Sequence, residues 1–289
     1  MEIKARAKIN LTLDVLRKRP DGYHDVKMIM QTVDLYDIIK LNCNQNGYIT
    51  MCTNLSYLPT GNKNIAYQAA QVFYEHTAIK NEGLHIDIYK NIPVSAGLAG
   101  GSTDAAAVLI ALNSIYETRL SESELMHMGK QLGADVPYCI MGGTALAEGI
   151  GDVLTRLPAM PPTTIVLAKP PISVSTLQVY KQLQLDRIVN RPDTDGAIDA
   201  IYNQDIIGIA KRMHNVLEAV TAKEHRIVNR IKNVMLGSEA LNAIMSGSGP
   251  TVIGVFGNDI CAQKAVMKLR KIVKEVFVVK TYQSNDGER

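Results

Sequence analysis

The sequence has few of the residues that mark secreted or membrane proteins. It contains four cysteines, three phenylalanines and no tryptophan, and its longest apolar run covers only residues 105–112. A helix that crosses a bilayer needs ~20 predominantly apolar residues, so no membrane-spanning segment is expected. The first ten residues alternate charged and apolar side chains and lack the apolar core of a signal peptide. These features predict a cytoplasmic protein.

The cysteines give no sign of a disulfide framework or of a metal cluster. Cys43, Cys52, Cys139 and Cys261 are far apart in the sequence. None forms a C-x-x-C pair or a cysteine–histidine group with zinc spacing. Scattered thiols in a chain of 289 residues are typical of reduced, buried side chains in an intracellular protein.

The charge balance excludes some classes of partner. The chain carries 31 basic and 28 acidic side chains, for a formal net charge of +3. This balance is too even to indicate a nucleic acid or a membrane surface, but it is compatible with a small anionic substrate. With 46% hydrophobic and 20% charged residues, the composition is that of a globular protein long enough for two domains.

The first segment has the clearest pattern in the sequence. From residue 3 to residue 15 every odd position is apolar and every even position is polar, which predicts a long β-strand with one buried face. Lys8 and Asn10 lie on its polar face, and a turn carrying Tyr23 and His24 follows. A solvated face is the ordinary interpretation of such a lysine, but an aromatic ring and an imidazole can also stack on a base and bind its edge.

A glycine-rich segment at residues 93–107 is the strongest local signal for ligand binding. Glycine lets backbone N–H groups approach a ligand, and a helix predicted from Asp104 to about Asn113 adds unpaired N–H groups at its start. Such a segment either binds phosphate or forms a turn before an alanine-rich helix. It matches neither the Walker A motif nor G-x-G-x-x-G. Asp104 would repel phosphate, so we expect it to point away or to act through magnesium.

Two shorter motifs add candidate functional groups. In LGADVPY, residues 132–138, Asp135 follows a helix-ending glycine, and the proline favours an extended residue before it. This pattern predicts a rigid turn, in which an aspartate is either a cap or a functional group. In SGSGPT, residues 246–251, a glycine-rich turn joins two predicted strands, either as a simple hairpin or as a second site for phosphate.

The remaining periodicity predicts an α+β protein with two domains. A shift to PAMPPTT near residue 160 predicts a boundary between an N-terminal domain at 1–157 and a C-terminal domain at 158–289. The last elements have the β-α-β-β-α-β order of a ferredoxin-like domain. We expect helices at 64–77, 121–132, 176–183, 204–220, 224–235 and 262–273, and strands at 84–88, 165–168, 241–245, 251–256 and 276–280.

Taken in order, five stretches of the chain resemble the GHMP kinase superfamily. They are AKINLTLDVL at 7–16, RPDGYH at 19–24, IPVSAGLAGGSTDAA at 92–106, LGADVPY at 132–138 and AKPPISVST at 168–176. The resemblance implies a fold in which an N-terminal α/β domain carries the phosphate-loop helix and a ferredoxin-like domain follows. It also implies an ATP-dependent small-molecule kinase that uses Mg²⁺. Thr103 departs from the family's usual serine, and Arg6 from its usual proline.

Within the superfamily, the resemblance is to members that act on a cytidine nucleotide. It implies phosphorylation of the 2-hydroxyl of 4-diphosphocytidyl-2-C-methyl-D-erythritol, a step of non-mevalonate isoprenoid precursor biosynthesis. The implied partner is this small molecule, with no nucleic acid and no membrane, and a homodimer is left open. Two alternatives stay open as well: a kinase for mevalonate- or homoserine-type substrates, and a nucleotide-binding regulator without catalysis.

The resemblance implies a role for each residue that matches the family motifs. Asp135 would accept the proton of the substrate hydroxyl, while Lys8 would keep that carboxylate ionised and offset charge on the transferred group. Asn64 and Lys90 would lie near the adenine and its sugar. The ATP phosphates would be bound by Pro93, Val94, Ser95, Ala96, Gly97, Leu98, Ala99, Gly100, Gly101, Ser102 and Thr103. The second substrate would be bound by Asn10, Tyr23, His24, Thr176, Tyr180, Gly247, Ser248 and Gly249. The metal ligands stay open, with Ser102 and Thr103 as candidates.

Overall fold

The computed structural model describes residues 1–283 of the chain. Its strands are β1 (Glu2–Lys18), β2 (His24–Cys43), β3 (Ile49–Thr53), β4 (Leu84–Tyr89), β5 (Thr144–Glu148), β6 (Val153–Arg156), β7 (Thr164–Lys169), β8 (His214–Asn215), β9 (Asn242–Met245), β10 (Val252–Phe256) and β11 (Glu275–Lys280). Its helices are α1 (Ile65–Thr77), α2 (Gly100–Ile115), α3 (Glu122–Leu132), α4 (Val136–Met141), α5 (Thr176–Gln182), the 3₁₀ turn η1 (Leu185–Arg187), α6 (Thr194–Tyr202), α7 (Ile206–Arg212), α8 (Glu218–Glu224), α9 (Ile227–Leu236) and α10 (Asp259–Leu269). No helix in this part of the chain is long and apolar enough to cross a membrane.

The chain forms two compact units that the backbone enters more than once. Unit 1 contains Met1–Ala7, Leu35–Val94 and Ala99–Met141, and unit 2 contains Lys8–Asp34, Ser95–Leu98 and the residues from Gly142 onward. The long strands β1 and β2 contribute residues to both units. This division does not coincide with a single cut between residues 157 and 158, and that predicted domain boundary stays a prediction.

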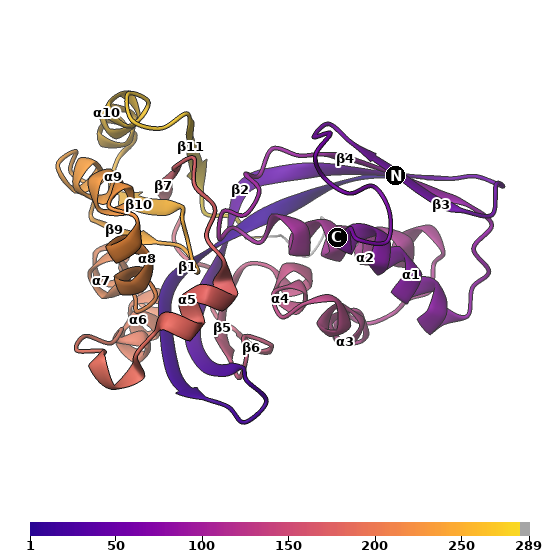
Figure 1. Cartoon of the computed structure of the whole chain (residues 1–289), viewed down its shortest axis with the longest axis horizontal. Coiled ribbons are helices and arrows are strands. Elements are labelled where there is room, and N and C mark those ends of the chain that lie inside the picture. Colours follow the sequence, from indigo (N-terminus) through magenta and orange to yellow (C-terminus); the bar gives the residue numbers. More distant parts are fainter. Residues whose placement is uncertain (284–289) are drawn as a thin grey trace. The chain divides into compact units, whose positions relative to one another are not determined.

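In unit 1, helices pack against one face of a sheet (Figure 1). The strand order is β3–β4–β2–β1, with β3 parallel to β4 and β4 antiparallel to β2. Leu84, Ile86 and Ile88 of β4 point into the core, where they meet Phe73 of α1 and the alanine-rich α2. The predicted strand at 84–88 and helix at 64–77 are therefore confirmed. This packing fixes α2, and with it the end of the glycine-rich segment.

The first strand is confirmed but its polar face is not solvated. The odd positions of β1 from Ala5 to Val15 are buried as predicted, and the polar side chains of Lys8, Asn10, Thr12 and Asp14 are buried as well. Each polar group on this face therefore needs a partner. The hydroxyl of Thr12, for example, accepts a hydrogen bond from the backbone N–H of Ile29 at 3.0 Å. Burial on both faces is the first sign that this strand carries functional groups.

Two helix starts differ from the sequence prediction. α2 begins at Gly100 rather than at Asp104, because Ala99 adopts a left-handed conformation that turns the chain directly into the helix. Asp104 consequently lies beyond the first turn. α4 begins at Val136 and contains Pro137. The prediction that the residue before the proline is extended is therefore wrong. A proline in the first helical turn has no intrahelical N–H bond to lose, which is why the helix accepts it.

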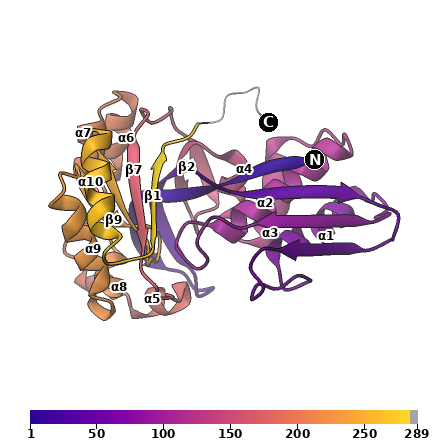
Figure 2. The ribbon, with the colours of Figure 1, turned by 90° about the horizontal axis from the view of Figure 1, so that it is seen from above.

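The ferredoxin-like arrangement predicted for the C-terminal part is confirmed in unit 2. The four strands have the order β11–β7–β10–β9, and every neighbouring pair is antiparallel. Helices α9 and α10 cover one face of this sheet (Figure 2). The turn at residues 246–251 joins β9 to β10, as the sequence predicts.

Other predictions for the second half of the chain are wrong. The helix expected at 204–220 is divided into α7, the short strand β8 and α8, and helix α6 was not predicted. None of the four cysteines is buried, although burial was expected. Cys43 and Cys52 are exposed, Cys139 and Cys261 are half-buried, and none of the four forms a disulfide.

Candidate active site

The glycine-rich segment has the backbone geometry of an anion site. Alternate residues Ser95, Gly97 and Ala99 have φ values of 51°, 73° and 56°, and such alternation of left- and right-handed residues turns successive N–H groups toward one side. α2 follows directly, and its N-terminal residue Ala99 offers no side-chain cap. The first N–H groups of that helix are left for another acceptor, because no side chain of the cap residue takes them.

Within unit 2, the central part of this segment is held by hydrogen bonds from two distant stretches of the chain. The backbone N–H of Lys8 donates to the carbonyl of Leu98 at 3.1 Å. The hydroxyl of Ser246 donates to the carbonyl of Gly97 at 3.0 Å. The first bond ties the segment to β1, and the second ties it to the turn after β9.

Lys8 and Asn10 form a buried polar pair on β1. The ammonium of Lys8 donates to Oδ1 of Asn10 at 3.0 Å, and the two side chains are 5% and 0% exposed. The amide of Asn10 donates to the sulfur of Met28 at 3.2 Å, and its backbone N–H donates to the hydroxyl of Ser246 at 3.3 Å. The strand therefore presents an amine in a buried, preorganised position rather than on a mobile surface side chain.

The turn at residues 246–251 is stabilised by a residue that the sequence analysis missed. The side-chain amide of Asn215 donates to the carbonyls of Met245 and Gly247 at 2.7 and 2.8 Å, and its Oδ1 accepts from the N–H of Leu217 at 3.0 Å. Asn215 lies inside the region that was predicted to be a continuous helix, so no local pattern marked it. Its contacts fix the backbone of the turn, and the N–H groups of Ser246 and Gly249 donate within the turn to the carbonyls of Thr251 and Ser246.

Two predicted substrate-binding residues also meet at this turn. The hydroxyls of Thr176 and Ser248 lie 2.8 Å apart, and the carbonyl of Ser248 accepts a hydrogen bond from Thr221 at 3.1 Å. Gly247 and Gly249 both have positive φ, at 57° and 91°. The start of α5 and the turn therefore form one polar cluster within unit 2.

The structure brings a second predicted pair together in unit 2. The rings of His24 and Tyr180 have centroids 5.1 Å apart and are tilted by 39°. Burial, and then the positive charge of Lys18, lower the pKa of His24, which keeps its imidazole neutral near pH 7. Tyr23 is 60% exposed. A neutral imidazole and an adjacent phenol ring are suited to an uncharged aromatic ligand.

In unit 1, Lys90 lies in a buried charged cluster. Its ammonium bonds a carboxylate oxygen of Asp37 and, at 2.6 Å, Oδ2 of Asp104. Asp37, which the sequence analysis did not single out, also accepts from the N–H groups of Asn91 and Ile92 at 2.6 and 2.8 Å. The cluster anchors the backbone just before the glycine-rich segment. It also shows that Asp104 points toward Lys90, in agreement with the expectation that its carboxylate avoids phosphate.

The charges in this cluster are unequal, with two carboxyls and one ammonium. Burial raises the pKa of Asp104 well above its ordinary value, the Lys90 ammonium opposes this shift, and the negative charge of Asp37 adds to it. Burial alone would lower the pKa of Lys90, but the two carboxyls outweigh it and the net shift is upward. Oδ1 of Asp104 is buried without a hydrogen-bond partner. Asp104 therefore holds a proton over a wider pH range than an ordinary aspartate does.

The other predicted site residues in unit 1 have separate positions. Asn64 is the N-cap of α1, where its Oδ1 accepts from the N–H of Ala66 at 3.0 Å and its amide donates to the carbonyl of Pro59 at 2.9 Å. The hydroxyl of Thr103 donates to the carbonyl of Arg6 at 2.7 Å. Asp135 lies directly before α4, and its carbonyl accepts from the N–H of Cys139 at 3.0 Å. Asp135 belongs to unit 1 and Lys8 to unit 2, so their pairing stays a prediction.

Two family models match the chain. The model of the GHMP kinases N terminal domain matches residues 64–143, and that of the GHMP kinases C terminal matches residues 197–274. The first range includes the glycine-rich segment and Asp135, and the second includes the turn at 246–251. The similarity inferred from the motifs is thus confirmed in both halves of the chain.

Curated relatives match over nearly the full length. A protein of Caldicellulosiruptor bescii named 4-diphosphocytidyl-2-C-methyl-D-erythritol kinase is 50% identical over 285 residues, which cover 99% of each chain. A protein of Alkaliphilus metalliredigens with the same name is 48% identical, over 98% of this chain and 97% of its own.

Solved structures extend the comparison. A crystal structure of 4-(cytidine 5'-diphospho)-2C-methyl-D-erythritol kinase superposes with a TM-score of 0.84 at 28% identity, and covers 98% of this chain and 100% of that chain. Homoserine kinase from Cytophaga hutchinsonii superposes with a TM-score of 0.74 at 19% identity, over 97% of this chain and 94% of its own. At that identity the second likeness concerns the fold alone.

Proposed function

The chain belongs to the family of 4-diphosphocytidyl-2-C-methyl-D-erythritol kinases, a branch of the GHMP kinases, and on this premise we propose that it phosphorylates 4-diphosphocytidyl-2-C-methyl-D-erythritol with ATP. The transferred group goes to the 2-hydroxyl of the methylerythritol unit, in the synthesis of isoprenoid precursors. The observation that carries the proposal is the 50% identity over 285 residues to a kinase of that name. The cytoplasmic location and the homodimer stay predictions from the sequence.

The glycine-rich segment supplies the site for the ATP phosphates. Its alternating backbone angles and the uncapped start of α2 offer N–H groups to an anion without a lysine of the Walker A type. Backbone donors are fixed before the nucleotide binds, so little reorganisation is needed at the moment of transfer. Asn64 and Lys90 lie near the adenine and sugar, where their role is to hold the surrounding backbone through the contacts described above.

Lys8 and Asp135 are the catalytic residues of this proposal. Asp135 accepts the proton of the acceptor hydroxyl as its oxygen attacks the γ-phosphorus, and the bond from that phosphorus to the bridging oxygen of ADP breaks. Lys8 offsets the negative charge on the transferred group. The burial of Lys8 and its bond to Asn10 support this assignment, because they fix the direction of the amine.

The cytidyl end of the acceptor binds to the polar cluster and ring pair of unit 2. The base stacks with Tyr180 and Tyr23, while the neutral imidazole of His24 binds its edge. Asn10, Thr176 and the turn at Gly247, Ser248 and Gly249 complete the site. Mevalonate and homoserine carry no base. A kinase for either substrate would therefore have nothing for Tyr180, Tyr23 and His24 to bind.

Magnesium enters as part of the substrate MgATP. Mg²⁺ prefers oxygen ligands and usually keeps several waters while it binds substrate phosphates. Thr103 is buried, with its hydroxyl held by the carbonyl of Arg6, whereas Ser102 in the first turn of α2 is half-buried. The carboxyl of Asp104 is bound to Lys90. Among the candidates, the hydroxyl of Ser102 is therefore the most accessible to the ion. The ion would neutralise charge on the phosphates there.

An acceptor panel tests the proposed function. Release of ADP is followed by a coupled assay with MgATP and, in turn, the cytidyl acceptor, mevalonate, homoserine or no acceptor. We expect ADP release to depend on the cytidyl acceptor, with kcat/KM at least about 100-fold above either alternative. A higher kcat/KM for mevalonate or homoserine would overturn the substrate assignment. Binding of ATP without turnover in any arm would identify a nucleotide-binding regulator instead.

A further inference from the structure

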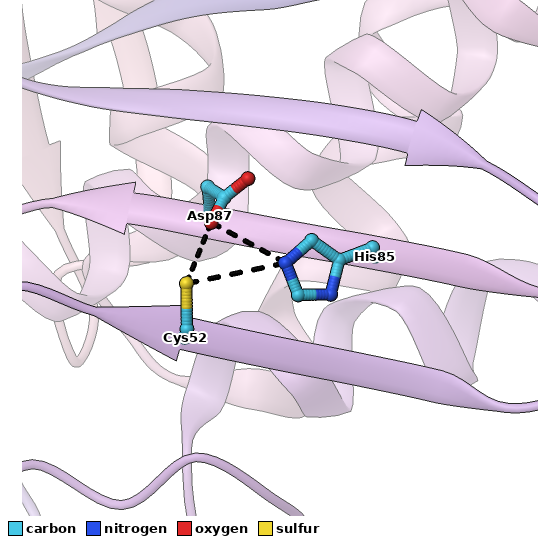
Figure 3. Close-up of side chains that lie close together, drawn as sticks. All are labelled: Cys52, His85 and Asp87. Atoms are coloured by element: carbon cyan, nitrogen blue, oxygen red, sulfur yellow. Dashed lines mark hydrogen bonds and ion pairs between the residues drawn. The ribbon is translucent and has the colours of Figure 1, made fainter.

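A cluster of three potential metal ligands lies on the sheet of unit 1, and none of the three was assigned a role above. Strands β3 and β4 run parallel, with Cys52 opposite Asp87 and Thr50 opposite His85. The intervening Met51 and Ile86 face the core beneath the helices. Side chains alternate along a strand, so Cys52, His85 and Asp87 all point to the opposite, open face of the sheet (Figure 3).

The three ligand atoms are close enough to share one ion. Nε2 of His85 lies 3.3 Å from Oδ1 of Asp87 and 3.9 Å from the sulfur of Cys52, and the thiol donates to the same carboxylate oxygen at 2.6 Å. Zinc bonds of about 2.0–2.3 Å at tetrahedral angles place ligand atoms about 3.3–3.6 Å apart. Two separations are within a few tenths of an ångström of that range. The third, between the sulfur and the carboxylate oxygen, would lengthen by about 1 Å when a metal ion replaced the thiol proton.

The hydrogen bonds around His85 orient its ring for metal binding. The hydroxyl of Thr50 lies 2.8 Å from Nδ1 of His85 and 3.3 Å from the carbonyl of Leu84. When the single proton of this hydroxyl goes to Leu84, Nδ1 can donate to the oxygen of Thr50. The lone pair of the neutral ring is then on Nε2 and faces Cys52 and Asp87. A metal-bound histidine uses its second nitrogen in the same way, as a donor to a neighbouring oxygen.

A nucleophilic role for the cysteine fits this geometry less well. A catalytic cysteine needs a base on its sulfur and a carboxylate behind that base, whereas Asp87 contacts the sulfur directly. A metal ion would place a positive charge between the sulfur of Cys52 and the carboxylate of Asp87 and bind both.

We propose that Cys52, His85 and Asp87 bind one divalent transition-metal ion of the zinc class, with a fourth position open to solvent. Thiolate and imidazole ligands select such ions over Mg²⁺, so the site is chemically distinct from one that takes MgATP. Binding forms the sulfur–metal bond and releases the thiol proton to solvent. Lys40 pairs with Asp87 in the sheet register, but its ammonium bonds Glu2 at 3.1 Å, which reduces its repulsion of a bound cation.

Cobalt binding to the full-length, reduced, metal-free protein tests the site. Co²⁺ reports a thiolate ligand through an intense near-ultraviolet charge-transfer band and a tetrahedral site through strong visible bands. We expect one equivalent of Co²⁺ to produce both, Zn²⁺ to displace it, and about one proton to be released per ion. Cys52→Ser should lose the charge-transfer band. His85→Gln should keep that band and weaken binding by at least about tenfold, as losses around metal sites do.

Cys43→Ser is the matched control, because Cys43 is also an exposed thiol in unit 1. This variant should bind Co²⁺ as the unmodified protein does, and all three variants should retain kinase turnover with MgATP. A charge-transfer band that survives Cys52→Ser, or affinities that are equal in all variants, would overturn the proposal. The absence of any band at one equivalent would do the same.

Discussion

The hydroxyl of Ser246 donates a hydrogen bond to the carbonyl of Gly97, although 149 residues separate them in the chain. The same hydroxyl accepts from the backbone N–H of Asn10 at 3.3 Å. One serine thus links the glycine-rich segment, the first strand and the turn after β9. These are three of the segments that the sequence singles out as candidates for ligand binding.

We expect Gly97→Ala to destabilise the protein by about 2–4 kcal/mol. Gly97 has φ of 73°, where an L-residue is strained. An added Cβ would also collide with the carbonyl oxygen of Ser246, and overpacking of this kind adds a further cost. Urea unfolding monitored by circular dichroism measures the loss.

Gly61→Ala is the control for that substitution. A Cβ at Gly61 would meet nothing within 4 Å, so the change in unfolding free energy should stay within about 0.5 kcal/mol. Equal stabilities for the two variants would show that the Ser246 carbonyl can move away and that the link does not hold the segment in place.

Lys90→Met should cost about 3–5 kcal/mol of stability. The ammonium is nearly buried between Asp37 and Asp104, with 6% of its side chain exposed, and its removal leaves two carboxyls without a buried positive partner. Methionine keeps the length of the side chain. Chemical denaturation at neutral pH gives the change in free energy.

A surface lysine provides the comparison for Lys90. Lys264 lies 3.1 Å from Glu239, with the two side chains 48% and 68% exposed. Lys264→Met should therefore change stability by less than about 1 kcal/mol. If Lys90→Met were equally mild, the buried cluster would contribute no more than an ordinary surface pair.

The proton on Asp104 should make stability fall as pH rises. Its folded-state pKa is raised, so the folded protein binds more protons than the unfolded chain once pH exceeds the ordinary value of about 3.9. The stabilisation that this proton contributes is fully present below that value, and it is lost as pH rises through the folded-state pKa. In Asp104→Asn this titration is absent. The stability of the Asp104→Asn variant relative to the unmodified protein should rise with pH by up to about 1.4 kcal/mol per unit over that interval.

Urea unfolding of both proteins at a series of pH values from 4 upward measures this difference. Groups common to the two proteins cancel, so the pH dependence of the difference belongs to residue 104 and the groups coupled to it. A difference that does not change with pH, or one that falls as pH rises, would contradict the assignment of the proton.

Local sequence patterns predicted elements whose ends are set locally. The strands of the ferredoxin-like sheet and the capping box at Ser121 belong to this class. The helix expected at 204–220 failed because its end depends on a distant residue. The amide of Asn242 donates to the carbonyls of Ala210 and Met213 at 2.7 and 3.2 Å, which ends α7, and the apolar periodicity continues through this point without a break.

The same distinction applies to the site. Motif order predicted which residues form the site, but not what holds them. The period-two pattern predicted one buried face for β1, yet Lys8 on the other face is buried too, because Asn10, Met28 and Ser246 form a polar and thioether environment around it. Cys52 and His85 lie 33 residues apart, a spacing outside the known zinc motifs. Only the parallel register of β3 and β4 brings them together.

Tyr180→Leu should raise KM for the cytidyl acceptor by about tenfold, since stacking on a base contributes about 1–3 kcal/mol. KM for ATP should change little, because Tyr180 is paired with His24, which is assigned to the cytidyl acceptor. Tyr180→Phe keeps the ring and should resemble the unmodified protein. Steady-state kinetics with each substrate varied in turn make the comparison. A parallel rise in both KM values would instead indicate a general disturbance of α5.

Asp135→Asn should lower kcat by about 10²–10⁴-fold, the usual contribution of a positioned general base. The amide keeps the shape of the side chain but cannot take the proton of the acceptor hydroxyl. The backbone carbonyl of Asp135, which accepts from Cys139 at the start of α4, is unchanged, so the fold should persist. KM for ATP should stay within a few-fold, because the phosphates are bound by the glycine-rich segment. Kinetics and a thermal melt of the same preparation separate the two effects.

Asp199→Asn, an exposed aspartate of α6, controls for the loss of one carboxylate and should leave kcat unchanged. If Asp135→Asn retained turnover within a factor of about three while its melt matched that of the unmodified protein, Asp135 would not be the base. Lys8 would then act alone, because its role and that of Asp135 were proposed as a pair. The proton of the acceptor hydroxyl would pass to water or to the transferred phosphate instead of to Asp135.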